Sequence, residues 1–310
     1  MAEFVILADF TCDLSASIRA EIGMDSYAKG HIHLGDGRDI SGTLDWEYIS
    51  REEFYKALSD KNNKITTSPM NEEEYFAYFE EYAKQGISVI SISLSSKISS
   101  TYVFASKAAS RINEKYPDVN IHCVDSLRMS GGIGLLTIYA HILKQEGKSF
   151  GEIVAWLEEN KSKVHQMGPI DDLFFIARRG RITMGKAIMG SFAGVKPMGD
   201  CNAEGYTSIL AKVKGINKAL DATVRYVKET AVDISNQYIL VVHSDREAYA
   251  QALKEKLVSE LSPKKVFLSD VFCGCGANIG PGMVGVYYLG ESVSEDLSAE
   301  KEAMKRILDK

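Results

Sequence analysis

Several features that would narrow the function at once are absent from this sequence. It has only five cysteines, and the one closely spaced pair, Cys273 and Cys275, has no second pair to complete a zinc site. The six histidines show no metal-ligand spacing either. No apolar run is long enough to cross a bilayer, and the N-terminal residues lack the basic stretch of a signal peptide. We therefore expect a cytoplasmic protein without a disulfide framework, a metal centre or a membrane span.

Excess positive charge and a P-loop are also missing. The chain has 36 Lys and Arg residues against 42 Asp and Glu residues, a formal net charge of −6. Non-specific binding to nucleic acid needs a basic face, so this class of partner is not expected. The glycine-rich stretch at 273–282 is not followed by Lys-Ser/Thr, so it is not a phosphate-binding P-loop, and we expect it to be a loop.

At 310 residues the chain is long enough for two domains, and its composition is that of a globular protein. Strand and helix patterns alternate up to about residue 160, which is typical of a mostly parallel sheet covered by helices. Beyond that point strands are more isolated and crossovers fewer. We therefore predict an α/β fold, with an α/β domain at 1–160 that carries hydroxyl-rich loops and a second, mixed α+β domain at 161–310.

Capping boxes mark the starts of three of the expected helices. The pairs are Ser50 with Glu53, Asn71 with Glu74, and Ser149 with Glu152. The expected helices span 14–22, 51–58, 72–84, 102–116, 131–145, 152–164, 217–230, 246–261 and 295–310. The expected strands or extended segments span 4–8, 27–34, 89–94, 119–124, 206–213, 238–243, 266–269 and 283–289.

The segment 88–101 is the most informative part of the chain. It begins as an apolar, β-branched strand, continues as a loop that contains Ser95, Ser96, Ser99 and Ser100, and leads into a helix. Free N–H groups and the positive end of the helix dipole favour an anion at such a position. An ordinary helix cap made by Ser99 or Ser100 is the alternative interpretation.

Three further loops share the polar character of this segment. They span 8–14, 66–69 and 124–134, and they carry hydroxyls and aspartates. In a doubly wound sheet the loops after the strands converge on one edge, where ligands bind. We therefore expect these four loops to surround one crevice.

The order of these motifs resembles that of the DegV family of bacterial fatty-acid-binding proteins, over nearly the whole chain. The matching segments are Asp9–Leu14, Thr67-Ser68, Ser95–Tyr102, Asp125-Ser126 with Ser130–Gly134, Gly180-Arg181-Ile182 followed by Lys196-Pro197, and Gly280-Pro281-Gly282. The resemblance implies a fatty acid bound between the two domains, as ligand and without a further cofactor. Its carboxylate would lie near Thr67, Ser99, Ser100 and Asn278, and its tail would be buried in the second domain.

The expected tail-lining residues are apolar side chains of the second domain, although each could equally be ordinary core. They are Phe174, Phe175, Ile188, Met189 and Phe192, with Val195 beside them. The resemblance also implies that the bound acid is presented to a separate fatty acid kinase, which Arg181 would face.

The chain departs from the family pattern at several positions. Phe10 replaces a serine, Ser100 and Arg179 replace glycines, and Asn278 replaces a histidine, so that an uncharged donor stands at this position.

Two enzymatic alternatives compete with a non-catalytic carrier. A serine hydrolase acting on an acyl ester would use Ser95, Ser96 or Ser99 with His243 and an aspartate. An enzyme acting on a small phosphorylated substrate would use the helix N-termini and glycine loops, but no lysine or carboxylate cluster accompanies them. We expect a carrier, because the sequence offers hydroxyl loops without an evident catalytic set.

Overall fold

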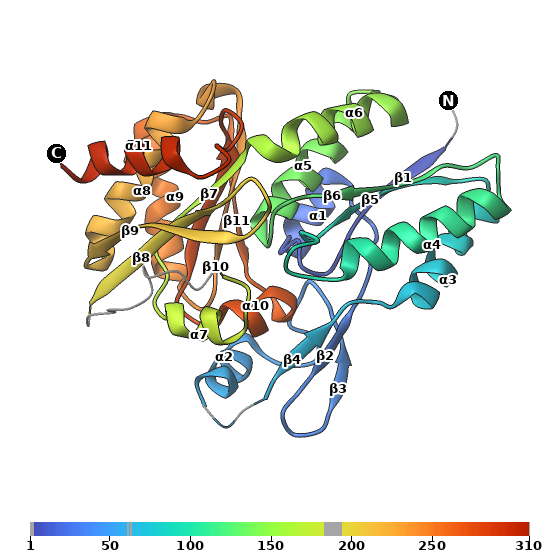
Figure 1. Cartoon of the computed structure of the whole chain (residues 1–310), viewed down its shortest axis with the longest axis horizontal. Helices are drawn as coiled ribbons and strands as arrows, with labels where there is room; N and C mark the ends of the chain where they lie inside the picture. The colour runs from blue at the N-terminus through green and yellow to red at the C-terminus, as the bar shows by residue number, and fades with distance from the viewer. Residues whose placement is uncertain (1–2, 61, 63, 183–193, 310) are drawn as a thin grey trace.

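The computed structural model describes residues 3–60, 62, 64–182 and 194–309. Two halves lie side by side, with helix α5 (Gly131–Gln145) between their sheets (Figure 1). The first half has a parallel sheet, and the second half has a mixed sheet. The predicted α/β architecture is therefore confirmed. No helix in the described ranges is long and apolar enough to cross a membrane.

The sheet of the first half has the order β1-β5-β6, formed by β1 (Phe4–Ala8), β5 (Ser88–Ser93) and β6 (Ile121–Asp125). All residues of β5 are buried, as expected of a parallel strand covered on both faces. Alternate side chains divide between the two faces. Leu7 and Val89 pack in the cluster under α3 (Glu72–Ala83) and α4 (Thr101–Lys115), whereas Ile6 and Ile90 pack in the cluster around α5.

Two further helices complete this half. The short helix α1 (Ala16–Ile22) contacts α5, and α6 (Phe150–Asn160) contacts both α5 and β6. The three capping boxes predicted from the sequence are present, at the starts of α2 (Arg51–Ser59), α3 and α6.

A small antiparallel sheet projects from the first half, at the bottom of Figure 1. It has the order β3-β2-β4, formed by β2 (His31–His33), β3 (Asp39–Ser41) and β4 (Thr66–Ser68). We expected 66–69 to be a loop, but Thr67 pairs with Ile32 of β2. Strand β2 lies within the extended segment expected at 27–34, but three-residue strands are too short to show periodicity, so the pairing of this sheet could not be recognised from the sequence.

The sheet of the second half has the order β11-β10-β12-β7. Strand β10 (Tyr238–His243) is parallel to β11 (Lys265–Asp270) and antiparallel to β12 (Val284–Leu289), which pairs with β7 (Val164–Met167). A hairpin of β8 (Val195–Cys201) and β9 (Thr207–Lys214) lies beside β7. The main helices of this half are α8 (Ile216–Thr230), α9 (Glu247–Leu261) and α11 (Ser298–Leu308).

Two further expectations were wrong. The helix expected at 152–164 ends at Asn160, and its last predicted residue begins β7. The glycine-rich stretch expected to be a loop contains the helix α10 (Cys273–Ile279). A Cβ on Gly274 would approach the Phe10 ring within 2.8 Å, and one on Gly276 would approach Phe54 within 2.8 Å. Close packing of this helix therefore overrides the low helix propensity of its glycines.

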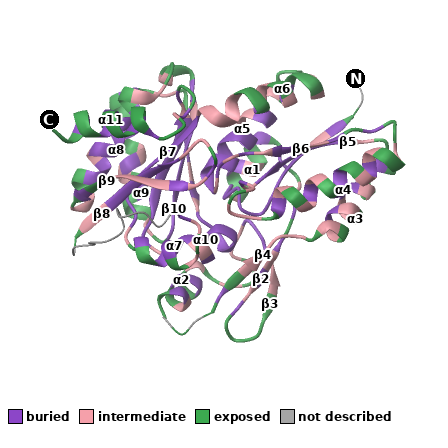
Figure 2. Ribbon diagram, viewed as in Figure 1, coloured by how far each residue is buried: buried purple, intermediate pink, exposed green. Residues whose placement is uncertain are grey.

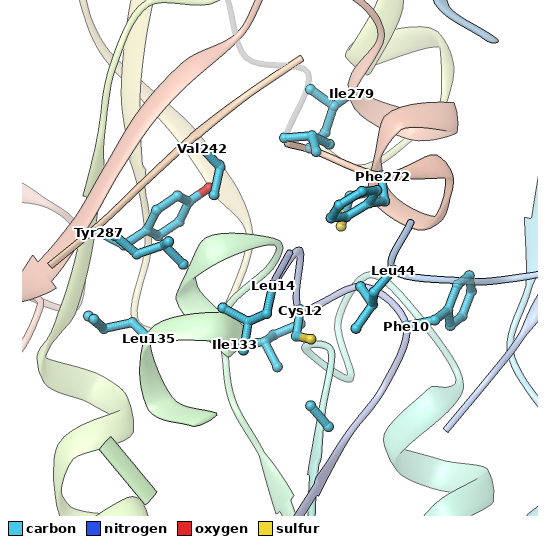
Figure 3. Packing of buried hydrophobic residues seen from close by; sticks show 14 of the residues in the cluster. Phe10, Cys12, Leu14, Leu44, Ile133, Leu135, Val242, Phe272, Ile279 and Tyr287 are labelled. Carbon is cyan, nitrogen blue, oxygen red and sulfur yellow. The ribbon is translucent and has the colours of Figure 1, made fainter. Parts of the chain in front are cut away.

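One hydrophobic cluster joins the two halves. It includes Leu14 of the first loop, Ile133 and Leu135 of α5, Val242 of β10 and Tyr287 of β12, which converge in Figure 3. Buried residues concentrate along the strands and α5, as Figure 2 shows. The halves thus share a core, and a domain boundary near residue 160 stays a prediction.

Phe10 fills the place where three glycine-containing segments meet. Its ring lies 2.3 Å from the position that a Cβ on Gly30 or on Gly42 would occupy, and 2.8 Å in the case of Gly274. Phe10 itself is buried. These glycines are required because the aromatic ring, together with a backbone oxygen at Gly30 and at Gly274, occupies the space that any larger residue would need.

Candidate functional site

A cavity of about 460 Å³ lies where the polar loops of the first half meet the strands of the second half. This volume lies within the range of about 300–1,000 Å³ typical of small-molecule sites. The residues of its lining range from exposed to fully buried. Lys97, Ser100 and Val103 are exposed, whereas Gln166, Gly199 and Tyr287 are buried. The cavity therefore runs from the surface near the start of α4 to the buried strands of the second half.

The four residues expected around a carboxylate all line this cavity. Thr67 lies on β4, Ser99 and Ser100 lie just before α4, and Asn278 lies on α10. The Asn278 Nδ2 donates a hydrogen bond of 3.1 Å to the Thr67 Oγ1. Residues 211 positions apart in the chain thus form one polar group.

Ser99 and Ser100 differ in how their hydroxyls are used. The Ser99 Oγ accepts a hydrogen bond of 3.2 Å from the backbone N–H of Thr101 and lies 2.7 Å from the Thr101 Oγ1. Ser100 is the N-cap residue of α4, but its side chain makes no capping hydrogen bond. The cap interpretation therefore applies to Ser99. The positive end of the 15-residue helix α4 lies at this end of the cavity, where it favours an anionic group.

The aspartates of the first loop do not line the cavity, contrary to our expectation of a crevice that combined them with the hydroxyls. The Asp9 carboxylate accepts backbone N–H groups of Thr11 at 2.8 Å and Leu94 at 2.7 Å. Burial raises the pKa of Asp9, although its hydrogen bonds act in the opposite direction. The Asp9 carboxylate therefore stabilises the loop backbone at Thr11 and at Leu94.

Asp13 lies in a second buried group that connects the halves. Its Oδ2 accepts the Ser130 hydroxyl at 2.5 Å, and its Oδ1 accepts the Phe272 backbone N–H at 2.9 Å. Burial raises the pKa of Asp13 to about 8. Both Asp13 and Ser130 have positive φ angles, of 53° and 51°, a conformation rare for residues with a side chain. The hydrogen bonds of this group hold that backbone geometry.

The apolar lining differs from the residues that we predicted for the tail. Phe174 of α7 (Leu173–Arg178) is 43% exposed, and Phe175 is buried against Gly280; neither lines the cavity. Ile188, Met189 and Phe192 lie outside the described residues. Val195 begins β8 and is absent from the described lining. The apolar side chains that do line the cavity include Met129, Met167, Ile170, Ile176, Ile279, Met283, Val284 and Tyr287.

Sequence reasoning missed part of this lining because it lies on strands whose pairing no local pattern reveals. Met167 and Val284 lie on β7 and β12, and the sequence alone did not reveal β7. The available signal was the glycine at 168, where a Cβ would lie 1.9 Å from the Val284 backbone oxygen. Such a close approach requires glycine and marks the contact between these two strands.

In the described part of the chain, the histidine expected to serve as the base of a serine hydrolase does not line the cavity. His243 ends β10 and its Nδ1 accepts the Arg246 backbone N–H at 3.4 Å, while its Nε2 lies 3.5 Å from the Asp270 Oδ1. Burial lowers the pKa of His243. No histidine occurs in the described lining of the cavity, and a nucleophilic serine needs a base within about 3.2 Å.

One Gly-x-Ser-x-Gly segment does occur, at 147–151, but it is not a nucleophile elbow. Its Ser149 is the N-cap of α6 and accepts the backbone N–H of Glu152, whose carboxylate accepts the Ser149 hydroxyl at 2.7 Å. This segment starts a helix and lies outside the cavity lining.

Arg181 lines the cavity and is partly buried. Its guanidinium donates to the backbone oxygen of Arg179. Arg179 in turn lies over the Phe175 ring, at 5.2 Å from the ring centroid. The segment therefore places positive charge beside the cavity.

Comparison with known proteins agrees with the motif order and the fold. The model of the family described as "Uncharacterised protein, DegV family" matches residues 3–291. The chain belongs to the DegV family. A DegV domain-containing protein of Clostridium perfringens is 33% identical over 94% of this chain and 99% of its own length.

Solved DegV structures share the fold. The Thermus thermophilus structure described as "Fatty Acid Binding of a DegV family Protein" superposes with a TM-score of 0.82 at 23% identity, over 93% of this chain and 99% of its own. The Streptococcus pneumoniae fatty acid kinase B3 protein loaded with linoleic acid gives a TM-score of 0.78 at 16% identity, over 93% of this chain and 100% of its own.

Proposed function

We propose that this DegV protein is a non-catalytic carrier of a long-chain fatty acid. The observation that carries the proposal is the cavity itself, to which Thr67, Ser99, Ser100 and Asn278 contribute polar groups and methionines and aliphatic side chains contribute an apolar lining. The carboxylate would accept hydrogen bonds from the hydroxyl and amide groups. The acyl chain would follow the apolar lining between the two halves.

The tail would supply most of the affinity. Each buried methylene contributes about 0.8 kcal/mol, so fifteen of them contribute roughly 12 kcal/mol before the costs of association. Those costs are about 4–15 kcal/mol. Each hydrogen bond to a charged carboxylate adds about 1.5–3 kcal/mol. The hydroxyls therefore fix the orientation of the acid more than they fix its affinity.

Presentation of the carboxylate to a fatty acid kinase is the second part of the proposal. The Streptococcus pneumoniae structure supports it, since its description names a fatty acid kinase protein. Arg181 beside the cavity is the residue that we assign to the kinase contact. The uncharged Asn278 would hold the head group without shuttling a proton.

Native mass spectrometry of the protein purified from a bacterial host tests the carrier function. We expect a mass increment of one acyl chain, which delipidation removes and added palmitate restores. A protein that carries no ligand after purification and does not bind added palmitate would contradict the proposal.

The double variant Thr67→Ala/Ser99→Ala tests the head-group assignment. It should still fold but should hold the carboxylate less firmly, and an unchanged ligand orientation would refute the assignment.

Arg181→Glu tests the kinase contact. At saturating palmitate, with loading of the variant checked by native mass spectrometry, we expect slower phosphorylation of the bound acid by a purified bacterial fatty acid kinase. Arg38→Glu is the matched control, because Arg38 is exposed and its side chain pairs with Asp36 in the turn before β3. Equal phosphorylation rates for both variants would remove Arg181 from the interface.

A further inference from the structure

The buried wall of the cavity carries a polar group that a plain alkyl chain leaves unexplained. Gln166 lies on β7, is 8% exposed and lines the cavity. Its Oε1 is buried and has no hydrogen-bond partner among the residues that the structure describes. Buried amide oxygens in native proteins almost always have a partner, so this atom points to a group supplied by a ligand or by water.

Gln166 is held in place by its strand. It pairs with Tyr287 of β12, which also lines the cavity, and its backbone N–H donates to the Asp200 carboxylate at 2.9 Å. Its backbone is thus tied to β12 on one side and to β8 on the other. The backbone position from which the Gln166 side chain extends is therefore fixed in the cavity wall.

A second polar side chain lies near the same end of β8. Thr207 is buried, lines the cavity and pairs with Cys201, the residue after Asp200. Its hydroxyl donates to the Met129 Sδ at 3.5 Å. A thioether is a weak acceptor, so this hydroxyl would pair better with an oxygen. Both side chains therefore offer hydrogen-bonding groups to the cavity.

We propose that the preferred ligand is a long-chain acid with a hydroxyl group on its chain, and that Gln166 is the residue that selects it. This inference rests on the proposed carrier function. A hydroxyl can donate to the Gln166 Oε1 and accept from the Thr207 hydroxyl. If the amide is turned by 180°, the same hydroxyl accepts from the Gln166 Nε2, so it pairs with either orientation.

Other oxygen-containing groups fit the wall less well. A keto group only accepts, so it pairs with the Gln166 Nε2 when the amide is turned but never with the Oε1, whereas a hydroxyl pairs with both. A second carboxylate would need a positive charge in the buried part of the site. In the described lining the cations are Lys97, which is exposed, and Arg181, which is partly exposed. A neutral donor and acceptor is therefore the chemistry that the wall recognises.

A competition experiment tests this selectivity. The delipidated full-length protein is mixed with equal amounts of stearic acid and one member of a positional series of hydroxystearic acids, and the bound species are counted by native mass spectrometry. One positional isomer should be retained about three- to tenfold over stearic acid, the gain of one added hydrogen bond. Gln166→Leu should reduce this ratio to about one.

Controls make each outcome decisive. Gln251→Leu makes the same chemical change at an exposed position on α9 and should keep the wild-type preference. Gln166→Met replaces Gln166→Leu if the latter lowers the melting temperature. Stearic acid bound at least as well as every isomer, or a preference that survives the loss of Gln166, overturns the inference and means that water satisfies the amide. If neither stearic acid nor any isomer binds, the carrier function itself fails.

Discussion

Two polar groups connect the halves of this molecule, and they differ in how fully their hydrogen-bonding capacity is used. Asp13 is fully buried, and both of its oxygens accept a hydrogen bond, from Ser130 and from Phe272. Thr67 and Asn278 are partly exposed and share one hydrogen bond of 3.1 Å. A satisfied buried group stabilises the fold, whereas a group with spare donors is available to a ligand. This difference separates residues that stabilise the contact between the two halves from residues that can bind a ligand in the cavity.

The largest expected effect is on the stability of the fold. Asp13→Ala would leave the Ser130 hydroxyl and the Phe272 N–H buried without their acceptor, at about 1–3 kcal/mol each. We expect the free energy of unfolding, measured in urea, to fall by roughly 2–5 kcal/mol. Asp118→Ala, in the exposed turn after α4, is the control. A loss below about 1 kcal/mol would show that the two groups do not differ as described.

The next effect concerns binding. Thr67→Val with Asn278→Leu removes a hydroxyl and an amide from the cavity and should weaken palmitate binding roughly tenfold, or about 1.4 kcal/mol. The free energy of unfolding should change by less than about 0.5 kcal/mol, since neither side chain is fully buried. Isothermal titration and urea unfolding of the same preparation measure the two quantities. A large loss of stability with unchanged affinity would reverse the comparison.

The pH dependence of stability tests the protonation of Asp13. Its pKa is about 8 in the folded protein and about 4 in an unfolded chain. Between these values the folded state keeps a proton that the unfolded state has lost, so the free energy of unfolding falls as pH rises. We expect a contribution of roughly 1 kcal/mol per pH unit between pH 5 and 7. Asp13→Asn should remove that slope, and parallel curves for the two proteins would count against it.

The smallest effect compares two serines at helix starts. Ser50 makes a complete capping box on α2, so Ser50→Ala should lower the free energy of unfolding by about 1 kcal/mol. Ser100 makes no capping hydrogen bond, so Ser100→Ala should change it by less than about 0.5 kcal/mol. The second variant should weaken palmitate binding instead. Equal losses of stability would show that Ser100 is a structural cap after all.

Local signals predicted much of the fold. The three capping boxes place helix starts because the side chains and the backbone groups that they bind lie within four residues. The apolar run of β5 predicted a strand buried on both faces. Strand β4 and helix α10 were not predicted, because their conformations depend on partners distant in sequence, namely Ile32 and Phe10.

The candidate site divides in the same way. The order of the family motifs brought Thr67, Ser99 and Asn278 to attention, and the structure places all three on one cavity. The spacing of these residues alone would not have done so. The part of the buried lining that lies on β7 and β12, Gln166 included, depends on how these two strands pair. That information requires the strand pairing and is not contained in any local pattern.

The enclosure of the Phe10 ring by Gly30, Gly42 and Gly274 constrains how this chain can evolve. A single replacement of any of these glycines collides with the ring, and a smaller residue at position 10 alone leaves a void. A truncated side chain at position 10 would make room for a methyl group only at position 42, because a Cβ on Gly30 would also lie 2.7 Å from the Ser68 backbone oxygen and one on Gly274 would lie 2.8 Å from the Phe10 backbone oxygen. Chimeras that exchange only one of these segments should therefore fold poorly.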